Sequence, residues 1–352
     1  MKDECIDSFN NYYKKTKNKI EKAMDKYNNS IVEDNDNRIV KELLNDFKDL
    51  NSDGKYIRGS IIALAYNNYL KDNKYLPLAV SYETLETALL VHDDIIDKGE
   101  KRRGKKTIHT RVSEKYKNID AYDYSNSQAM LVGDIAFFMI NKNIIKKYKN
   151  NKNILNILDK YNEIVIETIK GEIIDVDLPF ESMNLGYIAK EDDVLDIYKM
   201  KTAKYTILGP FELGLSLLGK KISNNLKEAL ESIGICFQIK DDILGVFGDS
   251  KVMGKPNVSD IEEFKQTILY TYAINTKYKN KLLEYYGKKI NEKDLDEVRK
   301  IFIDSNSLEY AENKMKELKN LAINNIDKEK ELTEESKKIL KGLITYIVKR
   351  NK

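Results

Sequence analysis

Apolar residues recur at helical spacing near the N-terminus. They stand three, four or seven positions apart at Ile6, Phe9, Tyr13, Ile20, Met24 and Tyr27, and again at Ile39, Leu43, Leu44 and Phe47. A helix brings residues three and four apart onto one face, so each segment predicts an amphipathic helix with one apolar side. The alternating pattern of strands is hard to find along the chain, which is therefore predicted to be all-α.

Several later segments are apolar on most sides, as buried helices are. Pro77 is predicted to open a helix that becomes apolar all round at 88–91. Further buried helices are predicted at 128–145 and 154–176, and a turn region is predicted at 179–186.

The middle of the chain carries two more long apolar runs. Segment 194–218 is interrupted at Gly209-Pro210, which predicts either a kinked helix or two helices. Segment 226–246 is continuous and ends in two aspartates.

Ser259 and Glu262 have the spacing of a capping box, which predicts a helix that starts there and includes Phe264 and Ile268. Charged amphipathic helices follow to the C-terminus. Since neither a repeat of fixed period nor a long linker interrupts the pattern, a single domain is expected over residues 1–352.

Composition argues against several classes of function. With 41% hydrophobic and 33% charged residues and a net charge of +3, the chain is expected to be globular. Its 57 acids nearly match its 60 bases, and no basic stripe stands apart, so nucleic-acid binding is not expected. No apolar run approaches about 18 residues, and the N-terminus lacks a signal-peptide pattern, so no membrane span is expected.

Cysteine and histidine are scarce. Cys5 and Cys236 lie far apart and form no disulfide or zinc pattern, which favours a cytoplasmic protein. His92 and His109 are the only histidines. Any metal is therefore expected to be held by carboxylates.

The most informative stretch lies at 89–106. An apolar helical run ends in Asp93, Asp94 and Asp97, and six basic residues follow within 98–106. Asp93 and Asp97 share a helix face, and Mg²⁺ prefers such oxygen ligands next to phosphates. The stretch predicts a magnesium and diphosphate site, although a solvated helix end is the simpler alternative.

A second acidic pair favours the magnesium and diphosphate site over the solvated helix end. Asp241 and Asp242 again end a buried helix, and the basic residues Lys251 and Lys255 follow. If the two helices face each other, their carboxylates line one cavity with room for three Mg²⁺ ions and a polyphosphate. A solvated helix end does not explain acids at the ends of two apolar helices.

From about Gly54 to Thr267 the chain resembles the trans-prenyltransferase, or polyprenyl diphosphate synthase, family. The matching motifs, in the family's order, are Gly54-Lys55-Tyr56-Ile57-Arg58, Asp93 to Asp97 with Arg102-Arg103-Gly104, Lys201-Thr202, Phe237-Gln238-Ile239-Lys240-Asp241-Asp242, Gly254-Lys255 and Asp260 to Thr267. The resemblance implies an all-α antiparallel bundle around a deep central cavity. It also implies a homodimer.

The resemblance assigns roles to these positions. Mg²⁺ would be held by Asp93, Asp97 and Asp241, with Asp94 and Asp242 supporting. The allylic diphosphate would be held by Arg102, Lys201 and Lys255, with Lys265, Thr202 and Gln238 nearby. Isopentenyl diphosphate would be held by Lys55, Arg58 and Arg103. The implied activity is head-to-tail condensation of these two diphosphates into a longer all-trans prenyl diphosphate.

Three positions depart from the family pattern. Glu86 stands where the family usually has His or Gln, Glu172 where it has Gln, and Gly245 where its second motif often has a third Asp. A regulatory subunit of a hetero-oligomeric synthase therefore stays open. A terpene cyclase also stays open, although the implied isopentenyl diphosphate site counts against it.

Product length is expected to depend on residues below the first motif. Ala88 and Leu89 precede Asp93 by about one turn, and neither is an aromatic residue that would floor a short cavity. Phe137 and Phe138 are candidates for a deeper floor. A C20 product is favoured, with C15 and with C25 or longer products left open.

Overall fold

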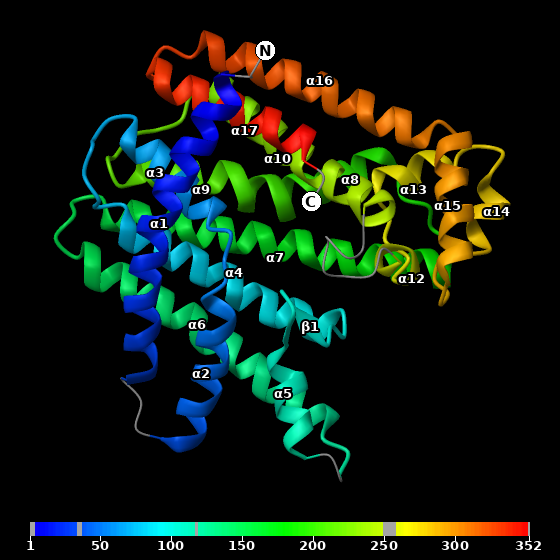
Figure 1. The fold of residues 1–352 in the computed structure, drawn as a ribbon, viewed down its shortest axis with the longest axis horizontal. Coiled ribbons are helices and arrows are strands. Elements are labelled where there is room, and N and C mark those ends of the chain that lie inside the picture. The colour runs from blue at the N-terminus through cyan, green and yellow to red at the C-terminus, as the bar shows by residue number, and fades with distance from the viewer. Residues whose placement is uncertain (1–3, 34–36, 117–118, 249–257, 351–352) are drawn as a thin grey trace. The chain divides into compact units, whose positions relative to one another are not determined.

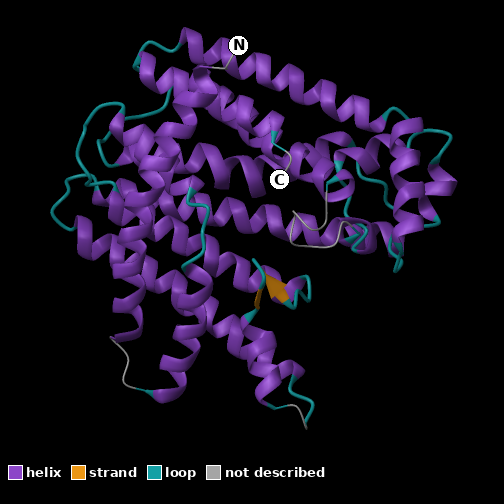
Figure 2. Ribbon diagram, viewed as in Figure 1, coloured by secondary structure: helices purple, strands orange, loops and turns teal. Residues whose placement is uncertain are grey.

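The computed structural model describes residues 4–33, 37–116, 119–248 and 258–350. Helices make up nearly all of the regular structure of this part, together with one pair of two-residue strands (Figure 2). The all-α prediction is confirmed. None of the described helices is both long and apolar enough to cross a membrane.

The elements are labelled as in Figure 1. The helices up to the middle of the chain are α1 (Glu4–Glu33), α2 (Arg38–Asn51), α3 (Ile57–Asn67), α4 (Leu76–Ile96), α5 (Ile108–Lys115), α6 (Tyr122–Tyr148) and α7 (Ile154–Leu185), and the strands are β1 (Lys101–Arg102) and β2 (Lys105–Lys106). Those that follow are α8 (Glu191–Ile197), the π-helix η1 (Tyr198–Leu208), α9 (Gly209–Ser216), α10 (Asn224–Phe247), α12 (Ser259–Glu262), α13 (Ile268–Ala273), α14 (Lys279–Leu283), α15 (Glu292–Asp304), α16 (Ser307–Lys328) and α17 (Glu334–Lys349).

The chain forms two compact units. The N-terminal unit comprises Asn11–Asp159 and Pro210–Lys221, and the C-terminal unit comprises Met1–Asn10, Lys160–Gly209 and Ile222–Lys352. Each unit is described on its own. The expectation of a single domain over residues 1–352 stays a prediction.

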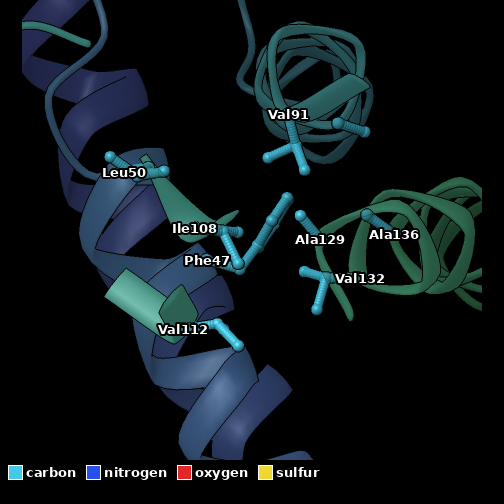
Figure 3. Close-up of a cluster of buried hydrophobic side chains, with 9 residues drawn as sticks. Phe47, Leu50, Val91, Ile108, Val112, Ala129, Val132 and Ala136 are labelled. Atoms are coloured by element: carbon cyan, nitrogen blue, oxygen red, sulfur yellow. The ribbon is translucent and has the colours of Figure 1, made fainter. Parts of the chain in front are cut away.

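In the N-terminal unit α4 packs along α6 and beside α3. A buried apolar cluster joins α4 and α6 to α2 and α5, and its residues are Phe47, Leu50, Ala88, Val91, Ile108, Val112, Ala129, Val132 and Ala136 (Figure 3). Gly133 allows the close approach, because a Cβ there would lie 2.3 Å from His92 Nε2. This packing fixes the end of α4, which carries the first aspartates.

In the C-terminal unit α10 packs against η1 and α16. A Cβ at Gly234 would lie 2.3 Å from the Cα of Ala203, so only glycine lets α10 and η1 approach this closely. Cys236 is fully buried in α10, as expected for a small core residue. The second acidic pair is thus carried by a buried helix.

The predicted turn at 179–186 was wrong. Helix α7 continues past Pro179 to Leu185, where a turn was expected, and Gln266 Nε2 donates to the Leu178 carbonyl (3.0 Å) to hold this end of the helix. At Gly209 the prediction of two helices is confirmed, because the π-helix η1 is followed directly by α9, and the Gly209 N–H donates to the Lys204 carbonyl five residues earlier.

The predicted capping box is also wrong. Val258 is the N-cap of α12, which ends at Glu262, and Phe264 adopts a left-handed conformation with φ 58°. Thr267 then caps the separate helix α13 by accepting from the Tyr270 N–H. The left-handed residue between the two helices prevents a continuous helix.

Candidate active site

The first aspartates lie at the end of α4, in the predicted register. The Asp97 N–H donates to the Asp93 carbonyl (2.8 Å), so these two residues are one helical turn apart. The Gly99 N–H then donates to the Asp94 carbonyl (2.8 Å), and Lys98 has a φ of 54°, which turns the chain out of the helix.

The basic segment beyond is a small β-hairpin. Lys101 pairs with Lys106 and Arg102 with Lys105. Arg103 and Gly104 form the two-residue turn with φ values of 53° and 78°. Two positive φ angles are the requirement of the hairpin turn whose twist matches the strands. The hairpin directs Arg102 back to the aspartates.

Arg102 joins two of the three aspartates. Its Nη2 lies 2.9 Å from Asp93 Oδ2 and 2.6 Å from Asp94 Oδ1, and its Nε donates to Asp94 Oδ1 at 2.7 Å. Asp94 is buried, and burial raises the pKa of this carboxyl to about 6, although Arg102 opposes the shift. Asp94 is therefore held inside the structure while Asp93 is more exposed.

A second arginine group lies on the same unit. Glu86 accepts from Arg103 Nη2 at 2.9 Å and lies 3.1 Å from Arg58 Nη1, so one carboxylate bridges two arginines. Burial would raise the pKa of Glu86, but Arg58 and Arg103 outweigh it and lower the pKa. Glu86, which departs from the family pattern, is thus a charged carboxylate with two cationic partners.

Glu83 lies one turn before Glu86 and is also buried. Burial, and then the charge of Glu86, raise the pKa of Glu83 to about 8, so it carries a proton at neutral pH. Its Oε1 accepts from the Gly59 N–H at 2.6 Å, next to Arg58 on α3. Sequence reasoning missed Glu83, whose only signal is its spacing from Glu86.

Lys55 precedes α3 and is exposed. The glycine before it is required locally, because a Cβ at Gly54 would lie 2.5 Å from the ring of Tyr56. Tyr56 has a φ of 55°, which turns the chain into α3 and leads to Arg58.

A small hollow opens between the acids and the apolar side of α4. Its lining combines apolar side chains with Asp94 and both arginines of the hairpin, namely Leu50, Thr87, Leu90, Val91, Asp94, Arg102 and Arg103. Ala88 is buried in the apolar cluster, and Phe137 packs against that cluster. Phe138 is 76% exposed. The predicted role of these residues in product length stays a prediction.

In the C-terminal unit Lys201 lies on η1 between two acids of α7. Its Nζ is 2.7 Å from Glu172 Oε2 and 2.6 Å from Asp175 Oδ2. Burial would raise the pKa of Asp175, but Lys201 and then Lys265 lower it. Sequence reasoning missed Asp175, although its three-residue spacing from Glu172 was a usable signal.

Asp242 is the centre of a buried hydrogen-bond network. It accepts from the hydroxyl of Tyr198 and from Gln238 Nε2 (2.8 Å), and Thr202 Oγ1 donates to Gln238 Oε1 (2.6 Å). Burial raises the pKa of Asp242 well above its usual value. The network links the Lys201-Thr202 motif of η1 to the aspartates of α10.

Asp241 points to a different partner, Arg350 at the end of α17. An Nη2–carboxylate pair joins them, and the guanidinium also stacks 4.0 Å from the Phe237 ring. Lys265 lies 3.1 Å from Glu263 Oε2. Lys255 lies outside the described residues.

The donor set of both acidic groups fits Mg²⁺. Asp93 and Asp241 offer carboxylate oxygens, the ligands this ion prefers, and each now faces a guanidinium, so each position accepts positive charge. Within the described ranges no group of three or more His, Cys, Asp or Glu side chains is gathered closely enough to hold a metal ion.

These features define an all-α protein with two aspartate-bearing helices, each beside basic side chains. The sequence profile described as Polyprenyl synthetase matches residues 40–302. The chain therefore belongs to the polyprenyl synthetase family and is a prenyltransferase that lengthens prenyl chains.

Individual relatives agree with this family. The chain is 31% identical to geranylfarnesyl diphosphate synthase of Aeropyrum pernix over 79% of its own length and 83% of the relative's. It is 30% identical to geranylgeranyl diphosphate synthase of Saccharolobus solfataricus over 93% and 98% of the two lengths. The fold matches a geranylgeranyl pyrophosphate synthase structure from Corynebacterium glutamicum with a TM-score of 0.84 at 23% identity, covering 97% of this chain and 99% of that one.

Proposed function

We propose that the chain condenses isopentenyl diphosphate with an allylic diphosphate in a Mg²⁺-dependent reaction. The observation that carries the proposal is the pair of basic groups on the N-terminal unit. Arg102 lies on the carboxylates of Asp93 and Asp94, while Arg58 and Arg103 meet at Glu86. A metal-assisted diphosphate site beside a separate two-arginine site suits an enzyme with two diphosphate substrates.

The acids would hold the metal, three Mg²⁺ ions in all. Asp93, Asp97 and Asp241 would be the ligands, and Asp94 and Asp242 would support them through their buried contacts. Bound Mg²⁺ supplies positive charge that stabilises the departing diphosphate.

The bases divide between the two substrates. Arg102, Lys201, Lys255 and Lys265 would hold the allylic diphosphate, and Lys55, Arg58 and Arg103 would hold that of isopentenyl diphosphate. Lys201 forms ion pairs with both Glu172 and Asp175. These pairs hold its ammonium group in one orientation and balance its positive charge.

The proposed reaction breaks the allylic C–O bond and leaves a delocalised carbocation and diphosphate. The double bond of isopentenyl diphosphate attacks this cation, and the new cation then loses a proton to the released diphosphate, which regenerates a double bond. Lysine and arginine at the departing oxygens stabilise the charge that develops there. Apolar residues such as Leu90 and Val91, beside Asp94 in the small hollow, would keep water away from the cation.

A C20 product is part of the proposal. Ala88 leaves no aromatic barrier one turn below the acids, and relatives at 28–30% identity bear the name geranylgeranyl diphosphate synthase. The Aeropyrum pernix relative, named for the longer geranylfarnesyl chain, supports C25 as the second candidate.

We also propose a cytoplasmic homodimer. Helix α6 exposes Leu131, Phe138 and Ile145 at seven-residue spacing, with exposed fractions of 52%, 76% and 49%. Such a stripe on one helix face suits a second copy of the chain better than water. The two separate free cysteines fit a reducing compartment.

Diphosphate release separates the candidate functions. The wild-type chain alone should release diphosphate only when Mg²⁺, isopentenyl diphosphate and an allylic primer are all present, and Asp93→Ala should lose at least about a hundredfold in rate. Release from the allylic diphosphate alone would favour a cyclase. Release only after addition of a second prenyl synthase subunit would favour a regulatory role.

A further inference from the structure

The turn between α2 and α3 carries Lys55, one of the basic residues proposed to bind isopentenyl diphosphate. The backbone of this turn is fixed on both sides, because the Tyr56 hydroxyl donates to the Ser52 carbonyl at 2.8 Å and the Tyr13 hydroxyl donates to the Lys55 carbonyl. Asp53 lies between these two anchored carbonyls. The position of the Asp53 carboxylate is therefore tied to that of Lys55.

Lys105 on β2 joins this turn to the hairpin. Its Nζ lies 2.5 Å from Asp53 Oδ2 and 2.6 Å from Asp49 Oδ1, and it donates to the Asp49 carbonyl at 3.0 Å. One ammonium group thus binds both the last turn of α2 and the turn that follows it. Because Lys105 comes two residues after Arg103, it connects Arg103 of the hairpin with the turn that carries Lys55.

Arg111 of α5 strengthens this connection. Its Nη2 lies 2.6 Å from Asp49 Oδ2, its Nη1 lies 3.0 Å from Asp46 Oδ1, and its Nε donates to the Lys106 carbonyl at 2.9 Å. Burial would raise the pKa of Asp49, but Lys105 and Arg111 lower it, so the carboxylate is charged at neutral pH. Strand β2 is thus anchored at both of its residues, through the side chain of Lys105 and the carbonyl of Lys106.

The hairpin needs such anchors, since each of its strands has only two residues. A two-stranded hairpin is marginally stable at best in water. On β1 the anchor is Arg102, which pairs with the first aspartates, and on β2 it is Lys105. Arg103 lies in the turn between the two strands. A loosened β2 would therefore move Arg103, while Arg102 would keep its own carboxylate partners.

We propose that Lys105 is a positioning residue that holds Arg103 and Lys55 in place for the diphosphate of isopentenyl diphosphate. The inference rests on the proposed function, which assigns Arg103 and Lys55 to this substrate. Lys105 acts through Asp53 and Asp49, whose carboxylates balance its charge. It thus contributes orientation rather than charge, and a small misplacement of binding groups is enough to weaken an enzyme.

Separate measurements for the two diphosphate substrates test this role. In Lys105→Gln, KM for isopentenyl diphosphate should rise about tenfold, while kcat and KM for the allylic primer stay within about twofold of the wild type. Lys105→Arg should return KM to within about threefold, because a guanidinium can also pair with carboxylates. The matched control is Glu42→Gln, which removes an acid of α2 that pairs with Lys115 and should leave both KM values unchanged.

Asp53→Ala separates positioning from charge. Removal of this acid makes the site more positive, so KM for isopentenyl diphosphate would fall if charge alone mattered. Loss of the anchor should instead raise this KM about threefold or more. An unchanged KM in Lys105→Gln, an equal rise for both substrates, or a lower KM in Asp53→Ala would overturn the role of Lys105 alone. A wild type that releases no diphosphate with both substrates would overturn the proposed function as well.

Discussion

Glu86 Oε1 accepts a hydrogen bond from Arg103 Nη2 at 2.9 Å. The same carboxylate reaches Arg58 at 3.1 Å, so the two arginines proposed to bind isopentenyl diphosphate share one acidic partner. The diphosphate and Glu86 would compete for the same guanidinium groups. Substrate affinity should therefore depend directly on the charge at position 86.

Glu86→Gln should tighten the binding of isopentenyl diphosphate. The substitution keeps the shape and an acceptor but removes the negative charge, and about 1.4 kcal/mol corresponds to a tenfold change. We expect KM for isopentenyl diphosphate to fall about three- to tenfold, with kcat within about twofold, in steady-state assays.

Glu114→Gln is the matched control, because Glu114 pairs with Lys106 on the other strand of the hairpin at 2.5 Å. It should leave KM unchanged. A rise in KM for Glu86→Gln would mean that Glu86 organises the two arginines for binding instead of competing with substrate.

Glu83→Gln should alter the pH dependence of stability. The pKa of Glu83 is raised from 4.5 to about 8, so the native state holds a proton that the unfolded chain releases. The contribution of Glu83 is fully present below pH 4.5 and is lost as pH rises toward 8. A glutamine at position 83 stays neutral, so the Glu83→Gln variant should not lose this stability as pH rises.

Urea unfolding at pH 5.5 and 8.5 measures the difference. Between these values the wild type should lose at least about 1 kcal/mol more free energy of unfolding than Glu83→Gln. Glu309→Gln, at an exposed position, should follow the wild type. Parallel pH profiles for wild type and Glu83→Gln would refute the assignment of a protonated Glu83.

Tyr198→Phe should destabilise the C-terminal unit. The hydroxyl of Tyr198 donates to Asp242 and accepts from the Ile268 N–H at 2.9 Å, so its removal leaves two buried polar groups without this partner. The expected loss is about 1–3 kcal/mol in urea unfolding at pH 7.

Tyr27→Phe serves as the comparison. The buried hydroxyl of Tyr27 has no hydrogen-bond partner in the part of the chain that the structure describes, so its removal should cost less than about 0.5 kcal/mol. Equal losses in the two variants would argue against a structural role for the Asp242 network.

Phe138→Asp distinguishes two roles of this residue. At 76% exposure on α6 it suits a dimer interface, and a charge there should convert the protein to monomers at micromolar concentration in light scattering. Leu155→Asp, which is equally exposed on α7 but outside the stripe, should remain dimeric. A dimeric Phe138→Asp that makes a longer product would instead support Phe138 as a cavity floor.

Local patterns predicted well what depends on neighbours in sequence. The one-turn relation of Asp93 and Asp97 follows from helical spacing alone, and so does the apolar burial of α4 and α10. The hairpin was missed because two-residue strands are too short to show an alternating pattern.

Contacts between segments that lie far apart in the chain could not be predicted from the sequence. The pairing of Arg350 with Asp241, and the seat of Asp260 against Gly245, join helices that no local spacing relates. Pro179 misled the prediction of a turn, because helix α7 continues through this proline to Leu185.

Sizing the product made by the purified chain tests the central claim most directly. Radiolabelled isopentenyl diphosphate is incubated with Mg²⁺ and a C5, C10 or C15 allylic primer, and the dephosphorylated products are separated by chain length. We predict labelled linear chains from the wild type alone, ending mainly at C20, and none after Mg²⁺ is chelated. Absence of any elongated product with every primer would contradict the account.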